Sequence, residues 1–233
     1  MRKIWLTLTV LVIFIAVCGV DHAPGADNGK RIRLKQGIIF LPDKIAETSP
    51  VVVIADFDRR CEKIMAHLRP GLARHGVIGI APFFRIRTDE RVRSSAVDIL
   101  QELVKKAEEK TGKQLNTLFV YSYSTAGTLG SQLAFMNPDL FRGLILAATY
   151  QPDKKNATRK NATRVPVLLL NGSQDKVFHP VRAVKTKKFL ADNGFDVHLD
   201  IIANATHSDV LKKHSDVFLK WILKKSKTAD RKK

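Results

Sequence analysis

Short apolar runs alternate with helical segments along almost the whole chain, and this alternation constrains the fold more than any other feature of the sequence. Most runs of β-branched or aromatic residues are followed by a stretch whose apolar residues recur at helical spacing. Strands linked by helices over short connections form a parallel sheet with helices on both faces. The sequence therefore predicts an α/β fold with a mostly parallel central sheet. The expected strands are residues 38–42, 51–54, 77–81, 118–121, 143–148, 165–170 and 196–202.

Two prolines mark places where this pattern should be interrupted. Pro42 ends the first expected strand, and because proline donates no backbone hydrogen bond it favours an edge strand, which we expect to pair with residues 51–54. Pro70 lies inside the first expected helix, residues 62–75, and should kink it or split it in two. Further helices are expected over residues 88–110, 181–193 and 210–222.

The N-terminus carries a pattern typical of export. Arg2 and Lys3 precede an apolar, uncharged run over residues 4–20, and small and polar residues follow it. This arrangement predicts a secretory signal peptide over residues 1–26, with an uncleaved membrane anchor as the alternative. Cys18 leaves a lipoprotein signal open as well. We therefore expect a secreted or periplasmic protein, which contacts a membrane only if this segment stays uncleaved.

The remainder of the chain is long enough for one well-buried domain, which we expect over residues 27–225, followed by a basic tail over residues 226–233. Once the signal is removed, Cys61 is the one remaining thiol, so the mature chain cannot form an internal disulfide. The formal net charge of +18 favours anionic surfaces or substrates. No zinc-ligand spacing or nucleic-acid-binding signature accompanies the basic residues, so we expect no metal, organic cofactor or nucleic-acid partner.

Ser124 lies at the centre of the most informative stretch, residues 116–137. An apolar strand over residues 118–121 leads to it and helical spacing resumes behind it, which places this serine on a strand-to-helix turn. Such a turn exposes the hydroxyl only when the residues two before and two after are small, and here they are Ser122 and Ala126. A helix N-cap role for Ser124, or a nucleophile at Ser122 instead, are the alternatives.

Two later loops carry the groups that a serine nucleophile needs. Asp175 and His207 each follow one of the last two expected strands. Loops at the carboxyl ends of parallel strands gather at one edge of the sheet. A serine hydroxyl requires a basic partner within hydrogen-bonding reach, and that base requires a carboxylate to fix its tautomer. Ser124, Asp175 and His207 therefore form a candidate triad in that order along the chain, with Asp209 as the alternative acid.

The small-residue turn at the serine, the buried strand that leads through Asn-Gly-Ser-Gln to an aspartate, and the order serine, acid, histidine resemble the α/β-hydrolase superfamily. The resemblance is closest to the compact dienelactone-hydrolase-like and polyester-depolymerase-like esterases, and it covers roughly residues 36–224. It implies that Ser124 attacks the substrate, that His207 shuttles the proton and that Asp175 orients the histidine.

The same resemblance implies an oxyanion hole formed by the backbone N–H groups of Thr125 and Phe57. In the family the loop before the second donor usually begins His-Gly, whereas here Ala55 and Asp56 stand in those places. A carboxylate beside a developing negative charge opposes catalysis unless it turns away or pairs with one of the arginines that follow it. Asp56 is therefore the feature that most departs from the family pattern.

Together these features predict a secreted serine hydrolase that cleaves carboxylic esters by acyl transfer. Residues 150–164, where many relatives insert a lid domain, are too few for one and are rich in Lys and Arg. We therefore expect an open site that accepts small or polymeric esters and favours those that carry negative charge. The alternatives are a serine peptidase of the same fold and a non-catalytic relative that binds an anionic polymer.

Overall fold

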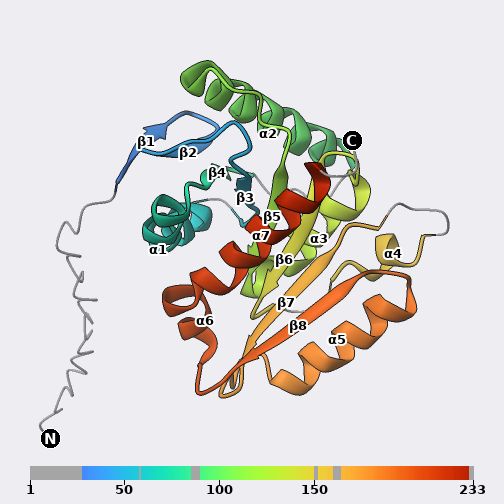
Figure 1. The fold of residues 1–233 in the computed structure, drawn as a ribbon. Helices are drawn as coiled ribbons and strands as arrows, with labels where there is room; N and C mark the ends of the chain where they lie inside the picture. The colour runs from blue at the N-terminus through green and yellow to red at the C-terminus, as the bar shows by residue number, and fades with distance from the viewer. Residues whose placement is uncertain (1–27, 58, 85–89, 150–151, 160–163, 231–233) are drawn as a thin grey trace, which may run out of the picture.

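An eight-stranded sheet forms the centre of the protein in the computed structural model, which describes the chain except for residues 1–27, 58, 85–89, 150–151, 160–163 and 231–233 (Figure 1). The strand order is β1-β2-β4-β3-β5-β6-β7-β8. The expected signal peptide lies outside the described residues. The strands are β1 Gly29–Arg33, β2 Gly37–Pro42, β3 Val51–Ile54, β4 Ile78–Pro82, β5 Leu118–Tyr123, β6 Phe141–Ala147, β7 Val167–Gly172 and β8 Val197–Ile202.

The strands from β4 across to β8 run parallel, and β1 and β2 extend one edge as antiparallel additions. The prediction of a mostly parallel α/β sheet is thus confirmed. The expected pairing of β2 with β3 is wrong, because β2 lies between β1 and β4. Pro42 does not interrupt the pairing of β2 with β4, since that pairing ends at Phe40, and it lies opposite Gly29 of β1. The edge strand β1 was not foreseen because its sequence, Gly-Lys-Arg-Ile-Arg, is too polar to indicate a strand.

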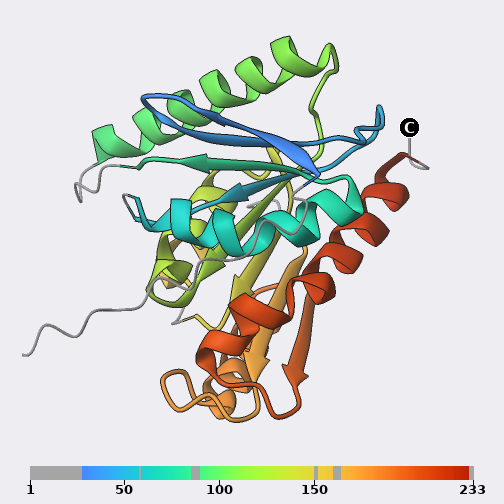
Figure 2. The same ribbon diagram turned by 90° about the vertical axis from the view of Figure 1, so that its left-hand side faces the viewer.

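Helices cover both faces of the sheet, and Figure 2 shows α2 and α1 on opposite sides of the strands near the β1 edge. On one face pack α2 (Glu90–Thr111), α3 (Gly127–Met136) and α5 (Pro180–Asp192). On the other face pack α1 (Arg60–His75), α6 (His207–Lys213) and α7 (Ser215–Asp230). A short helix, α4 (Lys154–Ala157), lies in the loop between β6 and β7.

Three helices differ from the expectation. α1 is not split at Pro70 but is a single helix, because its buried apolar face packs against the sheet on both sides of the proline. The segment 210–222 belongs to two helices, α6 and α7, with His214 between them. α7 continues to Asp230, into the segment that we expected to be a tail.

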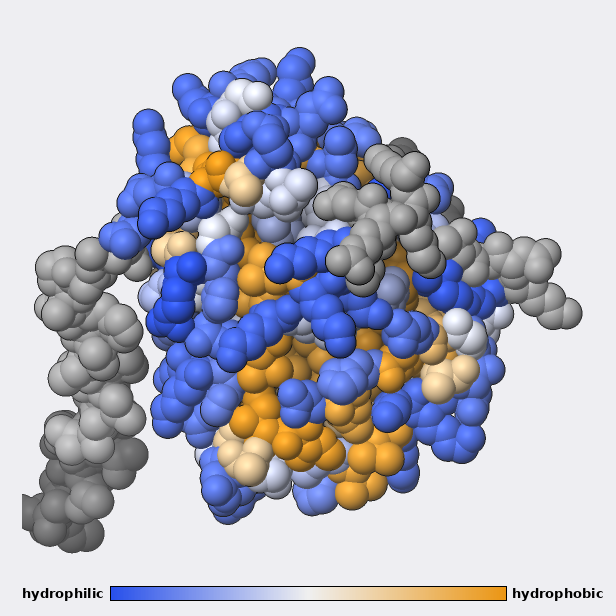
Figure 3. Space-filling model, viewed as in Figure 1, coloured by the Kyte–Doolittle hydropathy of each residue, from blue (hydrophilic) through white to orange (hydrophobic). Residues whose placement is uncertain are grey.

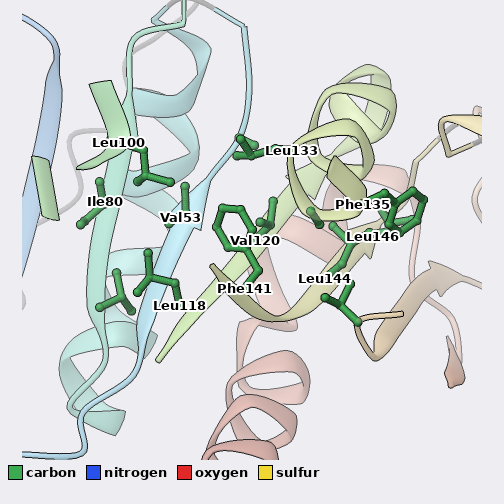
Figure 4. Packing of buried hydrophobic residues seen from close by; sticks show 14 of the residues in the cluster. Val53, Ile80, Leu100, Leu118, Val120, Leu133, Phe135, Phe141, Leu144 and Leu146 are labelled. Atoms are coloured by element: carbon green, nitrogen blue, oxygen red, sulfur yellow. The ribbon is translucent and has the colours of Figure 1, made fainter. Parts of the chain in front are cut away.

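The core has two layers, one on each face of the sheet. Alternate residues of a strand face opposite layers, so that Val53 joins the layer under α2, α3 and α5 while Val52 joins the layer under α1, α6 and α7. Figure 4 shows the first layer, in which Leu100 of α2 and Leu133 of α3 lie against strand side chains. Burial on both faces explains why the inner parallel strands are mostly apolar, whereas β8 at the edge of the sheet alternates and is partly exposed.

The surface in Figure 3 is mostly hydrophilic, with hydrophobic side chains gathered over the lower half, where β7 and β8 lie in Figure 1. Among the helices that the structure describes, none combines the length and the apolar character needed to cross a bilayer. The carboxyl ends of β3, β5, β7 and β8 meet at one edge of the sheet, and the candidate catalytic residues lie just beyond them.

Candidate active site

Ser124 lies where β5 turns into α3. A single 3₁₀ turn, Ser124–Ala126, joins the two elements, and the N-cap positions of this turn and of α3 are occupied by Tyr123 and Ala126. Ser124 is therefore not a helix N-cap. Its φ of 57° falls in the left-handed region that residues with a side chain rarely adopt. Such a conformation costs about 1–3 kcal/mol and persists only where the surrounding structure enforces it. A strained serine on a strand-to-helix turn is the geometry of a nucleophile elbow.

Two glycines of α3 allow the helix to approach the sheet closely behind this turn. A Cβ on Gly130 would lie 1.9 Å from the Oγ of Ser122, and a Cβ on Gly127 would lie 2.6 Å from the Cβ of Thr149. Ser122 itself is fully buried and donates a hydrogen bond to the carbonyl of Ala55 at 2.9 Å. This burial excludes Ser122 as the nucleophile. The close approach of α3 to the sheet therefore depends on Gly127 and Gly130. The sequence had pointed instead to the small residues Ser122 and Ala126 on either side of Ser124.

His207 and Asp175 complete a hydrogen-bonded chain with Ser124. The Nε2 atom of His207 lies 3.0 Å from the Oγ of Ser124, and its Nδ1 atom lies 2.8 Å from Oδ2 of Asp175. His207 is the first residue of α6 and follows the loop after β8, while Asp175 follows β7. The structure thus brings together the three residues of the candidate triad at distances suited to proton transfer.

The carboxylate of Asp175 is held in a fixed orientation. Its side chain is fully buried, and Oδ1 accepts hydrogen bonds from the backbone N–H groups of Val177 at 2.8 Å and Phe178 at 2.7 Å. Oδ2 is thereby left to face the imidazole. Gly172 brings this turn against the histidine loop, because a Cβ at this position would lie 2.1 Å from the carbonyl oxygen of Ala205. A larger residue at 172 would push the acid and the base apart.

Tyr123 is a further residue of the site that the sequence did not indicate. Its hydroxyl donates to the backbone carbonyl of His207 at 3.0 Å, and the two rings lie 5.1 Å apart between centroids. Burial and the nearby charge of Asp175 raise the pKa of Tyr123 to about 12, so the phenol remains a donor at neutral pH. Tyr123 therefore links the nucleophile turn to the backbone of the base. The expected strand ended at residue 121, two residues before Tyr123, whereas β5 continues to Tyr123 itself.

The carboxylate that departs from the family pattern, Asp56, lies just after β3. Asp56 is fully buried, and its Oδ1 accepts the backbone N–H of Phe57 at 2.6 Å. Burial raises the pKa of the Asp56 carboxyl, while the hydrogen bond from Phe57 and the charge of Arg60 offset part of the rise. The N–H of Phe57, one of the two expected oxyanion donors, is thus already engaged. Its role in an oxyanion hole stays a prediction and requires Asp56 to turn away.

Arg60 connects this carboxylate to the residue after the nucleophile. Its Nη2 donates to Oδ2 of Asp56 at 3.3 Å, and its Nη1 donates to Oγ1 of Thr125 at 2.9 Å. The side chain is 47% exposed, so water screens part of its charge. Asp56 thus pairs with a following arginine, one of the two conditions under which it would not oppose catalysis, and the same guanidinium contacts Thr125, the other expected oxyanion donor. Arg60 and Thr125 lie far apart in the sequence, and no sequence pattern indicated that they are in contact.

The alternative acid has a separate role. Asp209 accepts hydrogen bonds from the backbone N–H of Thr206 at 3.0 Å and from its hydroxyl at 2.6 Å, and it pairs with Lys213 at 2.8 Å. These contacts cap α6, and they lower the pKa of Asp209 well below its ordinary range. Within the described part of the chain, no group of three or more His, Cys, Asp or Glu side chains is arranged to hold a metal ion.

Comparison with known protein families identifies the family to which the chain belongs. Residues 36–231 match the sequence model of the dienelactone hydrolase family. The chain belongs to that family. The match spans the whole sheet beyond β1 and includes every candidate site residue, so membership of the dienelactone hydrolase family supports a hydrolase, and more narrowly an ester hydrolase. A search of curated protein sequences returned no match.

Solved structures with the same fold include several esterases. An S-formylglutathione hydrolase from Agrobacterium tumefaciens is 14% identical, with a TM-score of 0.63 over 86% of this chain and 96% of that one. An esterase from Pyrococcus furiosus is 10% identical, with a TM-score of 0.62 over 88% and 93%. A thermostable carboxylesterase cloned from a metagenomic library is 11% identical, with a TM-score of 0.62 over 84% and 88%. At these identities the likeness establishes the α/β-hydrolase fold.

Proposed function

We propose that this member of the dienelactone hydrolase family is a serine hydrolase that cleaves carboxylic esters by acyl transfer. The observation that carries the proposal is the hydrogen-bonded chain from Ser124 through His207 to Asp175, with the serine on a strained turn. A serine alone is a weak nucleophile at neutral pH, and this arrangement supplies the base and the orienting carboxylate that it needs.

In the first half of the proposed reaction, the Oγ of Ser124 attacks the ester carbonyl while the Nε2 of His207 takes its proton. Asp175 stabilises the imidazolium through Nδ1–H and holds the ring in the tautomer that leaves Nε2 free to accept. His207 then protonates the departing alcohol. In the second half, a water molecule attacks the acyl-enzyme, His207 takes its proton, and the acid is released from Ser124.

The proposed oxyanion donors are the backbone N–H groups of Thr125 and Phe57. Phe57 can donate to a substrate only when the Asp56 carboxylate leaves its N–H, so the proposal includes a rotation of Asp56 as substrate binds. Arg60 reduces the electrostatic cost of this step, because it neutralises the carboxylate and lies against Thr125.

A second candidate is a non-catalytic protein that binds an anionic polymer. The engaged N–H of Phe57 and the net charge of +18 favour it. A panel of p-nitrophenyl esters separates the two, since only the enzyme releases p-nitrophenol above the background of the Ser124→Ala variant. Aminoacyl anilides in the same panel test the peptidase alternative. Absence of hydrolysis on every ester would overturn the proposal.

We further propose that the enzyme acts outside the cytoplasm, on small or polymeric esters that carry negative charge. The basic N-terminus followed by an apolar run supports export, and the net positive charge supports steering of anions. Fractionation of cells that express the full chain, against cells that express a chain without residues 1–26, tests the location. Equal distribution of the two chains would contradict export through this segment.

A further inference from the structure

The two edges of the central sheet differ in how they are protected against a further strand. β1 and β8 are the edge strands and lie at opposite ends of the sheet (Figure 1). The edge at β1 carries exposed basic side chains, which repel a second copy of the same edge: Lys30, Arg31, Arg33 and Lys35. β8 contains no Lys, Arg or Pro, and none of the strands that the structure describes pairs with its outer side. The backbone of β8 is therefore open to pairing.

Exposed apolar side chains gather next to this open edge. In the described part of the chain, the large apolar side chains with at least 40% of their surface exposed are Val177, Val181, Val184 and Ile201. Ile201 belongs to β8, and Val181 and Val184 lie on the first two turns of α5, which packs against β8. Figure 3 shows hydrophobic side chains over the region where β7 and β8 lie. Exposed apolar side chains that are grouped in this way mark a contact with another molecule.

The charge around β8 allows two copies of a strongly basic chain to meet there. Residues 189–211 contain no Lys or Arg, although the whole chain carries 40 such residues and a net charge of +18. Lysines that pack near this stretch are paired with its aspartates: Lys188 with Asp192 at 2.9 Å, Lys213 with Asp209 at 2.8 Å and Lys225 with Asp196 at 2.8 Å. Repulsion between two copies is therefore smaller at β8 than at the basic edge formed by β1.

The alternation of side chains along β8 limits how two copies can pair. A two-fold axis perpendicular to the sheet sets the two β8 strands antiparallel and keeps each face of the sheet on its own side. Val197 and Leu199 pack against the layer under α2, α3 and α5, whereas Ile202 packs against the layer under α1, α6 and α7. Residues opposite one another across the axis must face the same layer, so the axis passes through a residue of β8.

Charge favours one of the three registers near the middle of β8. An axis at His198 places Asp196 opposite Asp200 of the partner subunit, and an axis at Asp200 places this carboxylate opposite its own copy. An axis at Leu199 instead places His198 opposite Asp200 of the partner subunit, twice by symmetry, where an imidazole N–H can donate to the carboxylate. The same register places Val197 opposite Ile201 of the partner subunit and so covers the exposed apolar side chain of β8.

We propose that the protein forms a homodimer in which β8 of each subunit pairs antiparallel with β8 of the other, about an axis through Leu199. The two sheets then join into one continuous sheet, and the two copies of α5 lie on the same face beside the paired strands. Because the paired strands run in opposite directions, the two candidate active sites open at opposite edges of the joined sheet, and each stays accessible. The homodimer does not depend on the proposed ester hydrolysis.

Cysteine cross-linking tests the register. In a Cys18→Ser background, Leu199→Cys should form a reducible disulfide dimer under mild oxidation. Residues directly opposite in antiparallel strands have Cα atoms about 4.5–5.5 Å apart, which is within the range of a disulfide. Ile201→Cys is the matched control on the same face of the same strand. Its two copies are offset by four residues, about 13 Å along the strand, which is too far for a disulfide.

The control is demanding because Ile201 is 40% exposed and Leu199 is less exposed. Random collisions between monomers would therefore cross-link Ile201→Cys at least as fast as Leu199→Cys. That outcome, or no cross-linking of a folded Leu199→Cys protein, would overturn the proposal.

Light scattering measures the association itself. The wild-type protein and Ser124→Ala should be dimers, whereas Leu199→Lys, which places two cations at the axis, should be monomeric at the same concentration. His198→Asp opposes carboxylates at two positions and should weaken dimerisation at least about tenfold. The exchange His198→Asp/Asp200→His restores the opposite partners and should return the dissociation constant to within about threefold of wild type. A monomeric wild type, equal association of wild type and Leu199→Lys, or an exchange variant no tighter than His198→Asp would each contradict this dimer.

Discussion

The two sides of Ser124 differ in how ready they are for reaction. On the acid–base side, His207 and Asp175 already make the hydrogen bonds that activate a serine, and two backbone N–H groups fix the acid. On the oxyanion side, the carboxylate of Asp56 accepts the N–H of Phe57. The proposed nucleophile is therefore preorganised in the resting chain, whereas the proposed charge stabilisation requires a side chain to move. In the proposed reaction, substrate binding rather than nucleophile activation therefore controls the assembly of the site.

The largest expected effect comes from removing the nucleophile. Ser124→Ala should lower turnover by about 10⁴- to 10⁶-fold, because in the proposed reaction the hydroxyl makes the first bond to the substrate. Folding should be retained, since the side chain faces the site. Ser122→Ala is the matched control, and it should keep activity within about tenfold of wild type because this buried hydroxyl bonds only to backbone within the fold. If Ser122→Ala lost activity while Ser124→Ala kept it, the nucleophile would be Ser122 and the assignment of the nucleophile elbow to Ser124 would be wrong.

The next largest expected effect tests the acid–base side of the site. Asp175→Asn should lower kcat by about 10⁴-fold. Its amide oxygen can still accept from Val177 and Phe178, which turns the NH₂ group towards Nδ1 of His207 and stabilises the wrong tautomer. Asp209→Asn, close in sequence but engaged with the cap of α6, should change kcat less than about tenfold. Equal losses in the two variants would mean that the acid has been misassigned.

A change in the opposite direction is expected on the oxyanion side. Asp56→Ala frees the N–H of Phe57 and removes a buried negative charge, so kcat should rise by about tenfold, less than the 10²–10³ that a full donor contributes. Asp139→Ala, which removes an exposed carboxylate elsewhere, should leave the rate unchanged. A fall in kcat for Asp56→Ala, with folding intact, would show that the carboxylate positions Arg60 and Thr125 instead of obstructing the donor.

A smaller loss is expected from the tyrosine that links the two halves of the triad. Tyr123→Phe removes the hydrogen bond to the carbonyl of His207 and should lower kcat by about three- to tenfold, equivalent to about 1 kcal/mol. Tyr121→Phe makes the same change two residues earlier on β5, where the ring packs against Phe218, and should have no effect on kcat. No difference between the two variants would remove Tyr123 from the site.

The smallest expected effect concerns stability. Burial raises the pKa of Asp56, so the folded protein holds this proton more tightly than the unfolded chain does. Stability from the protonated form is full at acid pH and is lost as the pH rises through the raised pKa. Asp56→Asn should therefore melt at a higher temperature than wild type near pH 7, and the difference should shrink as the pH falls. A constant difference from pH 4 to pH 8 would contradict the burial argument.

The sequence predicted the acid–base side of the candidate site better than the oxyanion side. Ser124, Asp175 and His207 each follow a strand of a parallel sheet, and that topology alone brings their loops to one edge. The state of the oxyanion side depends on the side-chain torsions of Asp56 and Arg60, which no strand or helix period encodes. The pairing of β2 was mistaken for a related reason, since a charged edge strand carries no apolar signal. The contacts of Asp56 and Arg60 with Phe57 and Thr125 were therefore the part of the site that sequence patterns could not supply.

Reaction with a fluorophosphonate probe tests the central claim most directly, because such probes bond only to a serine that a neighbouring base activates. The account predicts one adduct on the folded protein, located by mass spectrometry at Ser124, and its loss in His207→Ala. A folded wild-type protein that stays unlabelled, or an adduct on any other serine, would contradict it.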